Sequence, residues 1–404
     1  MTQPPSDWRK KTALFLLGQT LSLFGSSVVS FAVIWYLTLE TSSGVLMTVS
    51  ILCTFLPQLA VTPIAGVWAD RYSRKRLLIL SDLFIAAATL LLALCFFAGY
   101  QPLWLLFAVT AVRSLGTGVQ MPAVGAVLPQ LVPPEQLVRV NAINTAAASA
   151  MMLVSPAVGG IVLAGSGFAW ALMIDVTTAL CAVALMLLIK IPPHHSESRG
   201  GAVAEMRAGF AYARGHRLIR RLLIFYAAFF VLISPAAFLT PLMVERSFGP
   251  EVWRLTVNEI AWTAGSLLGG LLLSVWGGPR NKLTAMGVAS LGFGVTFAMR
   301  GLARNFVFYL AVMAVSGVFM PMFMAADTAL LQQTVEESMM GRVFSVVQLI
   351  ASAAMPLGML AFGPLADLVA IEWILLATGG ALVLLALSIL TDRPLLGMGK
   401  NKTP

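Results

Sequence analysis

The sequence predicts an all-α membrane protein with twelve transmembrane helices in two pseudo-symmetric six-helix halves. Three observations predict this class: the composition, the spacing of uncharged stretches and the distribution of cations. Of the 404 residues, 59% are hydrophobic and only 11% are charged, whereas a soluble domain has roughly 25% charged residues. This composition excludes a soluble globular enzyme, a disordered chain and a disulfide-stapled secreted domain, because a soluble protein of this size needs more polar residues to cover its surface.

The uncharged stretches have the length that a membrane requires. A spanning helix needs about 20 apolar residues to cross a core of roughly 30 Å. Turn residues and lone charges divide these stretches into twelve expected helices. In the first half the helices cover residues 12–39, 42–69, 77–98, 103–127, 139–164 and 168–190. In the second half they cover residues 219–244, 254–276, 283–303, 306–331, 340–366 and 371–391.

The cations predict the orientation, since Lys and Arg accumulate in cytoplasmic loops. With the N-terminus in the cytoplasm, 21 of the 26 cations lie in cytoplasmic segments and 4 lie outside. The remaining one, Arg113, lies within a helix, and we expect it to be the only cation deep in the membrane. Both termini are therefore expected in the cytoplasm. The net charge of +9 then follows from topology and predicts no nucleic-acid partner.

The chain is expected to divide into a half at 1–190, a central cytoplasmic loop at 191–217 and a half at 218–404. The two halves share short matches. The sequence GVQMP at 118–122 recurs as GVFMP at 317–321. An Arg-Val pair and then a proline follow in each half, in the same order. These matches predict that one half arose by duplication of the other.

The segment between the second and third helices reads GVWADRYSRKR at 66–76. A glycine lets neighbouring helices approach closely, and Asp70 can accept charge-assisted bonds from Arg74 or from a helix N-terminus. The pattern resembles the signature loop of the major facilitator superfamily; a generic cytoplasmic loop is the alternative, but it needs neither the glycine nor the acid. The resemblance implies a conformational latch made of Gly66, Asp70, Arg71, Arg74 and Lys75.

Two more motifs resemble this family. Arg113 precedes two glycines in the fourth helix, where a charge is costly unless it is paired or hydrated. The family's matching motif is linked to proton coupling, while a structural arginine satisfied by carbonyl groups is the alternative. The sequence SPAVGG at 155–160 is similar to the GPxxGG motif of drug:proton antiporters, with serine in place of the first glycine. It implies a hinge and seal made of Ser155, Pro156, Gly159 and Gly160, or else an ordinary kinked helix.

Besides Asp70 in the signature segment, four acids lie at or near membrane depth: Asp82, Asp175, Glu259 and Asp327. A carboxyl group at low dielectric holds a proton more readily, as a proton-coupled carrier requires. The resemblance implies that helices 1, 4, 7 and 10 line the cavity, which makes Asp175 and Asp82 structural partners. Glu259 is the first candidate for proton coupling, with packing or an outer gate as the alternative. Asp327 is the second candidate, and Arg113 is expected to tune whichever acid acts.

Polar and aromatic side chains suggest where a substrate binds. Gln19, Ser22 and Ser26 share one face of the first helix, where they could line the cavity or bond between helices. The aromatic residues at 225–230 could contact an apolar substrate, although their spacing is typical of packing. The cysteines form no metal or disulfide motif, and we expect no metal site. No phosphate loop or nucleophile motif occurs, so neither an enzyme nor ATP-driven transport is expected.

The chain resembles the bacterial macrolide-efflux branch of the superfamily. The sequences on which this resemblance rests include FLP at 55–57, SPAV at 155–158, GGLLL at 269–273 and AMPLG at 354–358. The resemblance implies a monomeric antiporter of the bacterial inner membrane that exports small hydrophobic or cationic compounds. It would need no cofactor and would be driven by the proton gradient. A lysophospholipid or lipid flippase and a siderophore exporter of the same fold are the alternatives.

Overall fold

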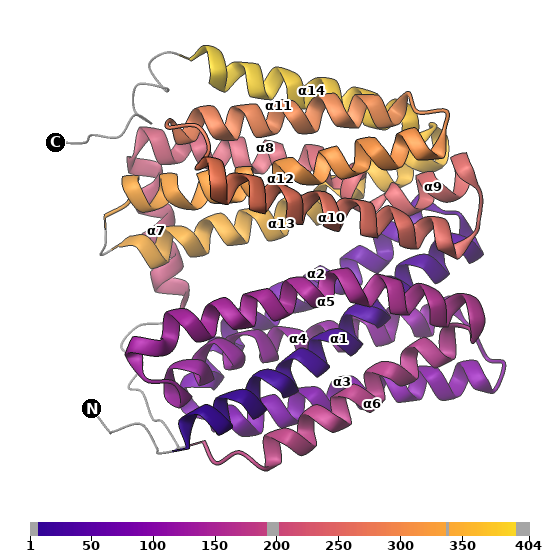
Figure 1. Ribbon diagram of the computed structural model, residues 1–404, viewed down its shortest axis with the longest axis vertical. Helices are drawn as coiled ribbons and strands as arrows, with labels where there is room; N and C mark the ends of the chain where they lie inside the picture. Colours follow the sequence, from indigo (N-terminus) through magenta and orange to yellow (C-terminus); the bar gives the residue numbers. More distant parts are fainter. Residues whose placement is uncertain (1–6, 192–201, 337–338, 393–404) are drawn as a thin grey trace. The chain divides into compact units, whose positions relative to one another are not determined.

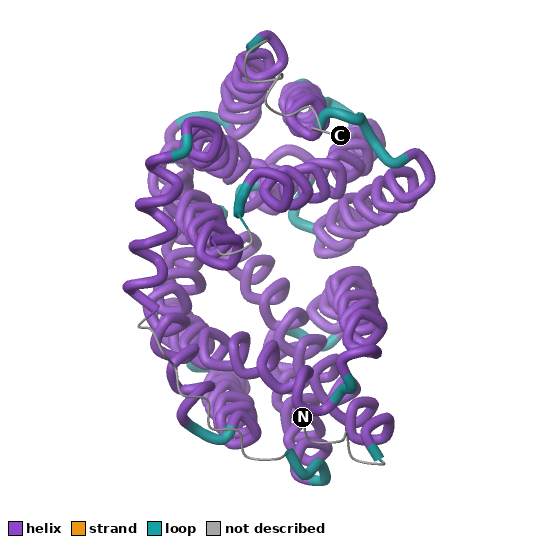
Figure 2. Tube along the Cα trace, turned by 90° about the vertical axis from the view of Figure 1, so that its left-hand side faces the viewer, coloured by secondary structure: helices purple, strands orange, loops and turns teal. Residues whose placement is uncertain are grey.

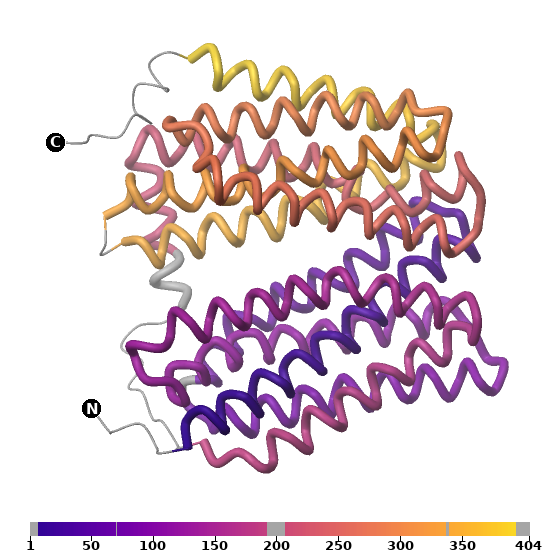
Figure 3. Tube along the Cα trace, viewed as in Figure 1, coloured from indigo at the N-terminus to yellow at the C-terminus, as the bar shows by residue number. Residues whose placement is uncertain are grey.

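A computed structural model of the protein describes residues 7–191, 202–336 and 339–392. Within these ranges the regular structure is helical, with short connections and no strand (Figure 2). Among the described residues, twelve helices are long and apolar enough to cross a membrane, which confirms the predicted fold class. Figures 1 and 3 follow them along the chain.

The helix bounds agree closely with the predicted ones. In the first half the spanning helices are α1 (Trp8–Thr41), α2 (Gly44–Arg71), α3 (Arg74–Phe97), α4 (Leu103–Leu131), α5 (Leu137–Gly165) and α6 (Phe168–Leu187). In the second half they are α8 (Arg217–Phe238), α10 (Val252–Trp276), α11 (Lys282–Gly301), α12 (Phe306–Thr334), α13 (Met340–Leu368) and α14 (Ile371–Thr391). A 3₁₀ turn, η1 (Pro134–Gln136), precedes α5.

One expected helix, 219–244, is interrupted in the structure. The helix α8 ends at Phe238, and a shorter helix α9 (Thr240–Phe248) follows after Leu239. Pro241 explains the break, because proline has no N–H to donate and its ring crowds the preceding turn. In the first turn of α9 the missing N–H costs nothing, since it would have no partner there.

The described part of the central segment contains a helix that the sequence did not predict, α7 (Ala202–Gly215). Residues 192–201 of the expected loop lie outside the described residues. Gly209 brings α7 against the start of α13, because a Cβ atom at this position would lie 2.7 Å from the carbonyl oxygen of Arg342. The ring of Tyr212 stacks on that of His216 near the end of the helix, with centroids 4.0 Å apart.

The chain divides into two compact units. The first contains Met1–Tyr36 and Val49–Ala202, and the second contains Leu37–Thr48 and Val203–Pro404. Within the first unit α3 packs against α4 and α6, and within the second α11 packs against α12 and α14. The third spanning helix of each half therefore contacts the fourth and the sixth, as duplication would produce.

The second unit includes the segment Leu37–Thr48, which connects α1 to α2. The carboxylate of Asp367 accepts hydrogen bonds from the backbone N–H groups of Gly44 and Val45, at 2.6 and 3.0 Å, and thereby caps the first turn of α2. Arg246 pairs with the same carboxylate at 3.0 Å. Thr48 donates from its hydroxyl group to the carbonyl oxygen of Met359 at 3.0 Å. Side-chain contacts thus attach this segment to α9 and α13.

Candidate functional site

Arg113 of α4 forms an ion pair inside the first unit. Its Nη1 atom bonds to Oδ2 of Asp175 on α6 and to the hydroxyl group of Thr89 on α3. Ser26 of α1 donates to the other oxygen of Asp175 at 3.1 Å. Asp175 is 1% exposed, so this pair joins four helices in a buried position.

This pair differs from the expected partners of Arg113. Asp175, expected to be a structural partner, lies next to the arginine that was expected to tune Glu259 or Asp327. Both of those acids belong to the second unit. The acid in contact with Arg113 is Asp175.

Asp82 of α3 forms a second polar cluster in the first unit. Its Oδ1 accepts hydrogen bonds from Ser22 of α1 at 2.8 Å and from Nε2 of Gln120 of α4 at 2.7 Å. Ser22 and Ser26 therefore bond between helices, which was one of the two alternatives for this face of α1. Gln19, one turn earlier, has its Nε2 buried without a partner among the described residues.

The signature segment lies between α2, which ends at Arg71, and α3, which begins at Arg74. Arg74 donates to the carbonyl oxygens of Ala69 and Ala126, at 3.0 and 2.7 Å. Lys75 donates to those of Leu187 and Ile189 at the end of α6, at 3.1 and 2.6 Å. The carbonyl groups of Ala69, Leu187 and Ile189 lie at or just beyond helix C-termini, where positive charge is favourable.

For Gly66 and Asp70, two other residues of the expected latch, the structure describes no side-chain contact. At Gly66 the structure leaves open space, with no described atom within 4 Å of where a Cβ atom would lie. The side chain of Asp70 lies outside the described residues.

The hinge motif lies on α5, which continues through Pro156 without interruption. Ser155, Pro156, Gly159 and Gly160 are all buried. A Cβ atom at Gly159 would meet Val28 of α1 at an ordinary contact distance of 3.7 Å. The Oγ atom of Ser155 has no partner among the described residues.

Asp327 of α12 bonds to the hydroxyl group of Tyr226 on α8. This contact places it beside an aromatic cluster rather than in the pocket described next. The rings of Phe229 and Phe323 stack there with centroids 4.0 Å apart. The aromatic residues at 225–230 are buried, so packing, one of their two predicted roles, is observed.

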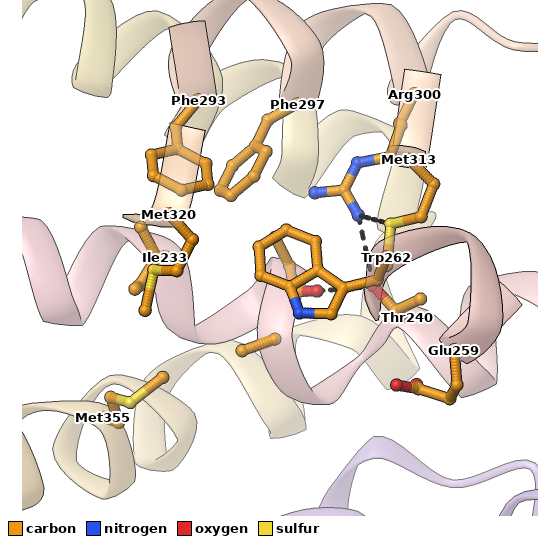
Figure 4. A pocket seen from close by; sticks show the side chains of 12 residues that line it. Ile233, Thr240, Glu259, Trp262, Phe293, Phe297, Arg300, Met313, Met320 and Met355 are labelled. Carbon is orange, nitrogen blue, oxygen red and sulfur yellow. Dashed lines mark hydrogen bonds between the residues drawn. The ribbon is translucent and has the colours of Figure 1, made fainter. Parts of the chain in front are cut away.

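The second unit contains a cavity of about 170 Å³ (Figure 4). Glu259 and Trp262 enter it from α10, and Arg300 enters it from α11. Its remaining walls are formed by Ile233, Ala236, Ala237, Thr240, Phe293, Phe297, Met313, Met320 and Met355. The cavity is therefore mostly apolar and aromatic, with one acid and one cation.

Glu259 is half-buried in this cavity. The neighbouring Nδ2 atom of Asn258 lies 3.5 Å from its Oε1, at the limit of a hydrogen bond. The first candidate for proton coupling therefore lies in an apolar pocket, with its carboxyl group directed into the space drawn in Figure 4.

Arg300 corrects the expectation that Arg113 is the only deep cation. Arg300 was expected among the four outer cations, yet its side chain is only 1% exposed, inside the last turn of α11. A signal was present: Phe293, Phe297 and Arg300 follow at i, i+4 and i+7, which places them on one helical face. A count of charges alone does not use that spacing.

A profile of the Major Facilitator Superfamily matches residues 15–359. With twelve spans and this match, the chain belongs to the major facilitator superfamily, a family of membrane transporters that are not enzymes in general. It is 30% identical to Macrolide efflux protein A of Streptococcus pyogenes over 387 residues, covering 95% of this chain and 96% of that protein.

A more distant relative and a solved structure are also similar to this chain. Multidrug efflux pump Tap of Mycobacterium tuberculosis (strain CDC 1551 / Oshkosh) is 25% identical over 364 residues, covering 88% of this chain and 86% of Tap. The crystal structure of a POT family transporter in complex with 5-aminolevulinic acid superimposes with a TM-score of 0.77, covering 96% of each chain. At 13% identity this likeness establishes the fold alone.

Proposed function

We propose that this protein exports macrolides and other small hydrophobic, often cationic compounds in exchange for protons, by alternating access. One observation carries the proposal: Glu259 presents a carboxyl group inside a pocket of aromatic and methionine side chains, in a chain whose relatives include efflux proteins. Methionine side chains adapt to varied ligands, and aromatic faces attract cations.

The size of the pocket limits what it can hold in this conformation. Sites for drug-sized molecules measure roughly 300–1,000 Å³, whereas this cavity measures about 170 Å³. Only one amine-bearing part of a larger compound would therefore enter beside Glu259. A proton that reaches Glu259 from outside would neutralise the carboxylate and release that cation, which couples the two movements.

A resistance assay tests the coupling role of Glu259. In a bacterium lacking its own macrolide pumps, the wild-type protein should raise macrolide resistance and lower drug accumulation, and an uncoupler should abolish both effects. Glu259→Gln should remove resistance at equal expression. Glu251→Gln, which changes an exposed acid paired with Arg254 at 2.9 Å, is the matched control and should behave as wild type.

Two outcomes would contradict the proposal. Full resistance with Glu259→Gln would remove this acid from the coupling, and Asp327, in contact with Tyr226, would be the next variant to make. Export that continues in the presence of the uncoupler would favour a lysophospholipid or lipid flippase of the same fold.

The remaining features fit this proposal as follows. The halves at 1–190 and 218–404 would move about the hinge on α5, both termini would lie in the cytoplasm, and the transporter would act as a monomer without a cofactor. Asp70 would latch one conformation. Asp70→Asn should then impair transport and leave drug binding intact, and unimpaired transport would contradict the latch.

A further inference from the structure

Arg300 is a buried cation that forms no ion pair with any described acid, Glu259 of the same cavity included. Its Nη1 atom lies 3.5 Å from the hydroxyl oxygen of Thr240 and 3.0 Å from the sulfur of Met313. The ring of Phe297 lies 4.5 Å from the guanidinium carbon. The hydroxyl group of Tyr309 also lies near the guanidinium group. All four neighbours are uncharged.

Two donors of this guanidinium group remain free. Its Nε and Nη2 atoms are buried and have no hydrogen-bond partner among the described residues. These two nitrogens form one edge of the guanidinium plane, the edge that grips a carboxylate through two parallel hydrogen bonds. A buried donor without a partner destabilises a protein, and a buried charge does so by more. The unused edge therefore indicates a ligand.

The position of Arg300 restricts the ligand further. Arg300 lines the same cavity as Phe293, Phe297 and Trp262, and Figure 4 shows its guanidinium group directed toward Phe297 and Trp262. An apolar cavity of about 150 Å³ is large enough to take benzene, and this one measures about 170 Å³. The space thus fits one aromatic ring or a branched apolar group that carries a single anionic group.

We propose that Arg300 binds the carboxylate of a small aromatic or branched apolar acid in this cavity. The ring lies among Phe293, Phe297 and Trp262, while the Nε and Nη2 atoms of Arg300 donate to the two carboxylate oxygens. This anion subsite goes beyond the proposed export of cationic compounds, and it places an acid-binding group in the same pocket as Glu259. A compound with both an amine and a carboxylate can then use both groups.

The test measures binding of a matched pair of probes to the full-length protein in lipid nanodiscs at pH 7. Tritiated benzoate and tritiated benzamide have nearly the same shape, but only benzoate is anionic. We expect benzoate to bind at least tenfold more tightly. Arg300→Met, which keeps an unbranched apolar side chain, should weaken benzoate to the level of benzamide and leave benzamide within twofold of wild type.

Two more variants keep the test decisive. Arg304→Met removes an exposed arginine from the same region and should leave both affinities unchanged. Arg300→Lys keeps the charge without the planar fork, and should weaken benzoate by an intermediate factor. It replaces Arg300→Met if that variant does not fold.

Three results would overturn the proposal: equal wild-type affinity for benzoate and benzamide, unchanged benzoate affinity in Arg300→Met, or competition by chloride as strong as competition by benzoate. The assay involves no transport and no macrolide. A failure of macrolide export therefore leaves this result standing, and a failure here leaves the proposed export standing.

Discussion

Replacing Asp175 with asparagine removes one charge from the ion pair with Arg113 and retains a side chain of nearly the same size. Asp175 is 1% exposed and the Arg113 side chain is 12% exposed, so water can replace little of the lost interaction. Removing one partner of a buried pair costs about 3–5 kcal/mol, because the other charge stays buried and uncompensated. At about 2–4 °C per kcal/mol for a domain of this size, the first unit should melt roughly 6–20 °C lower.

The assay is thermal unfolding of purified protein in one detergent, followed by tryptophan fluorescence. Asp82→Asn is the matched control, since Asp82 is equally buried but bonds to Ser22 and Gln120 rather than to a cation. It should cost less than about 2 kcal/mol. We expect the double variant Arg113→Met with Asp175→Leu to lose at least about 1 kcal/mol less free energy of unfolding than the two single variants together. A difference of about this size is the coupling energy usual for residues in contact.

Two results would refute this reasoning. A melting temperature for Asp175→Asn no lower than that of Asp82→Asn would show that the pair contributes little to stability. Strict additivity in the double variant would show that the two side chains do not interact. If the double variant also keeps proton-driven transport, the pair stabilises the fold and is not required for coupling.

Two further predictions concern close backbone contacts and the cap of α2. Gly265→Ala should destabilise the second unit by at least 2 kcal/mol in the same melting assay, on the order of an overpacked core. The added Cβ would lie 1.9 Å from the carbonyl oxygen of Ala314. The control Gly66→Ala, in open space, should be neutral or slightly stabilising. Equal losses of stability in the two variants would contradict the reasoning. Asp367→Ala should cost about 1–2 kcal/mol of local stability and speed hydrogen exchange at Gly44 roughly 5–30-fold, and unchanged exchange would show that the cap is unimportant.

The spanning helices could be predicted from the sequence because length and apolarity alone define them. The same criteria miss the interruption at Leu239, since Thr240–Phe248 follows α8 without a charged or turn-like separator. Pro241 was the local signal, but a proline within an apolar run is also compatible with an unbroken helix, as Pro156 shows in α5.

The partners of buried charges could not be predicted in this way. Arg113 and Asp175 are 62 positions apart, and from the sequence we expected Arg113 to act on Glu259, the first candidate, or Asp327, the second. The choice depends on which helices pack together, here α3 with α4 and α6. Arg300 was assigned to the outer surface because it lies close to the outer end of the predicted helix 283–303, where a cation is usually exposed. Only its shared face with Phe293 and Phe297 distinguishes it.

The attachment of Leu37–Thr48 to the second unit has a consequence for dissecting the protein. A gene divided within the central segment would place Leu37–Thr48 on the N-terminal fragment. The residues that hold this segment, Asp367 and Arg246, would lie on the C-terminal fragment. The C-terminal fragment produced alone would lack Gly44 and Val45, whose backbone N–H groups donate to the carboxylate of Asp367. Each fragment is then expected to fold correctly only when the other is present. Co-expressing a mutated fragment with its wild-type partner, in both combinations, would reveal which half fails to fold.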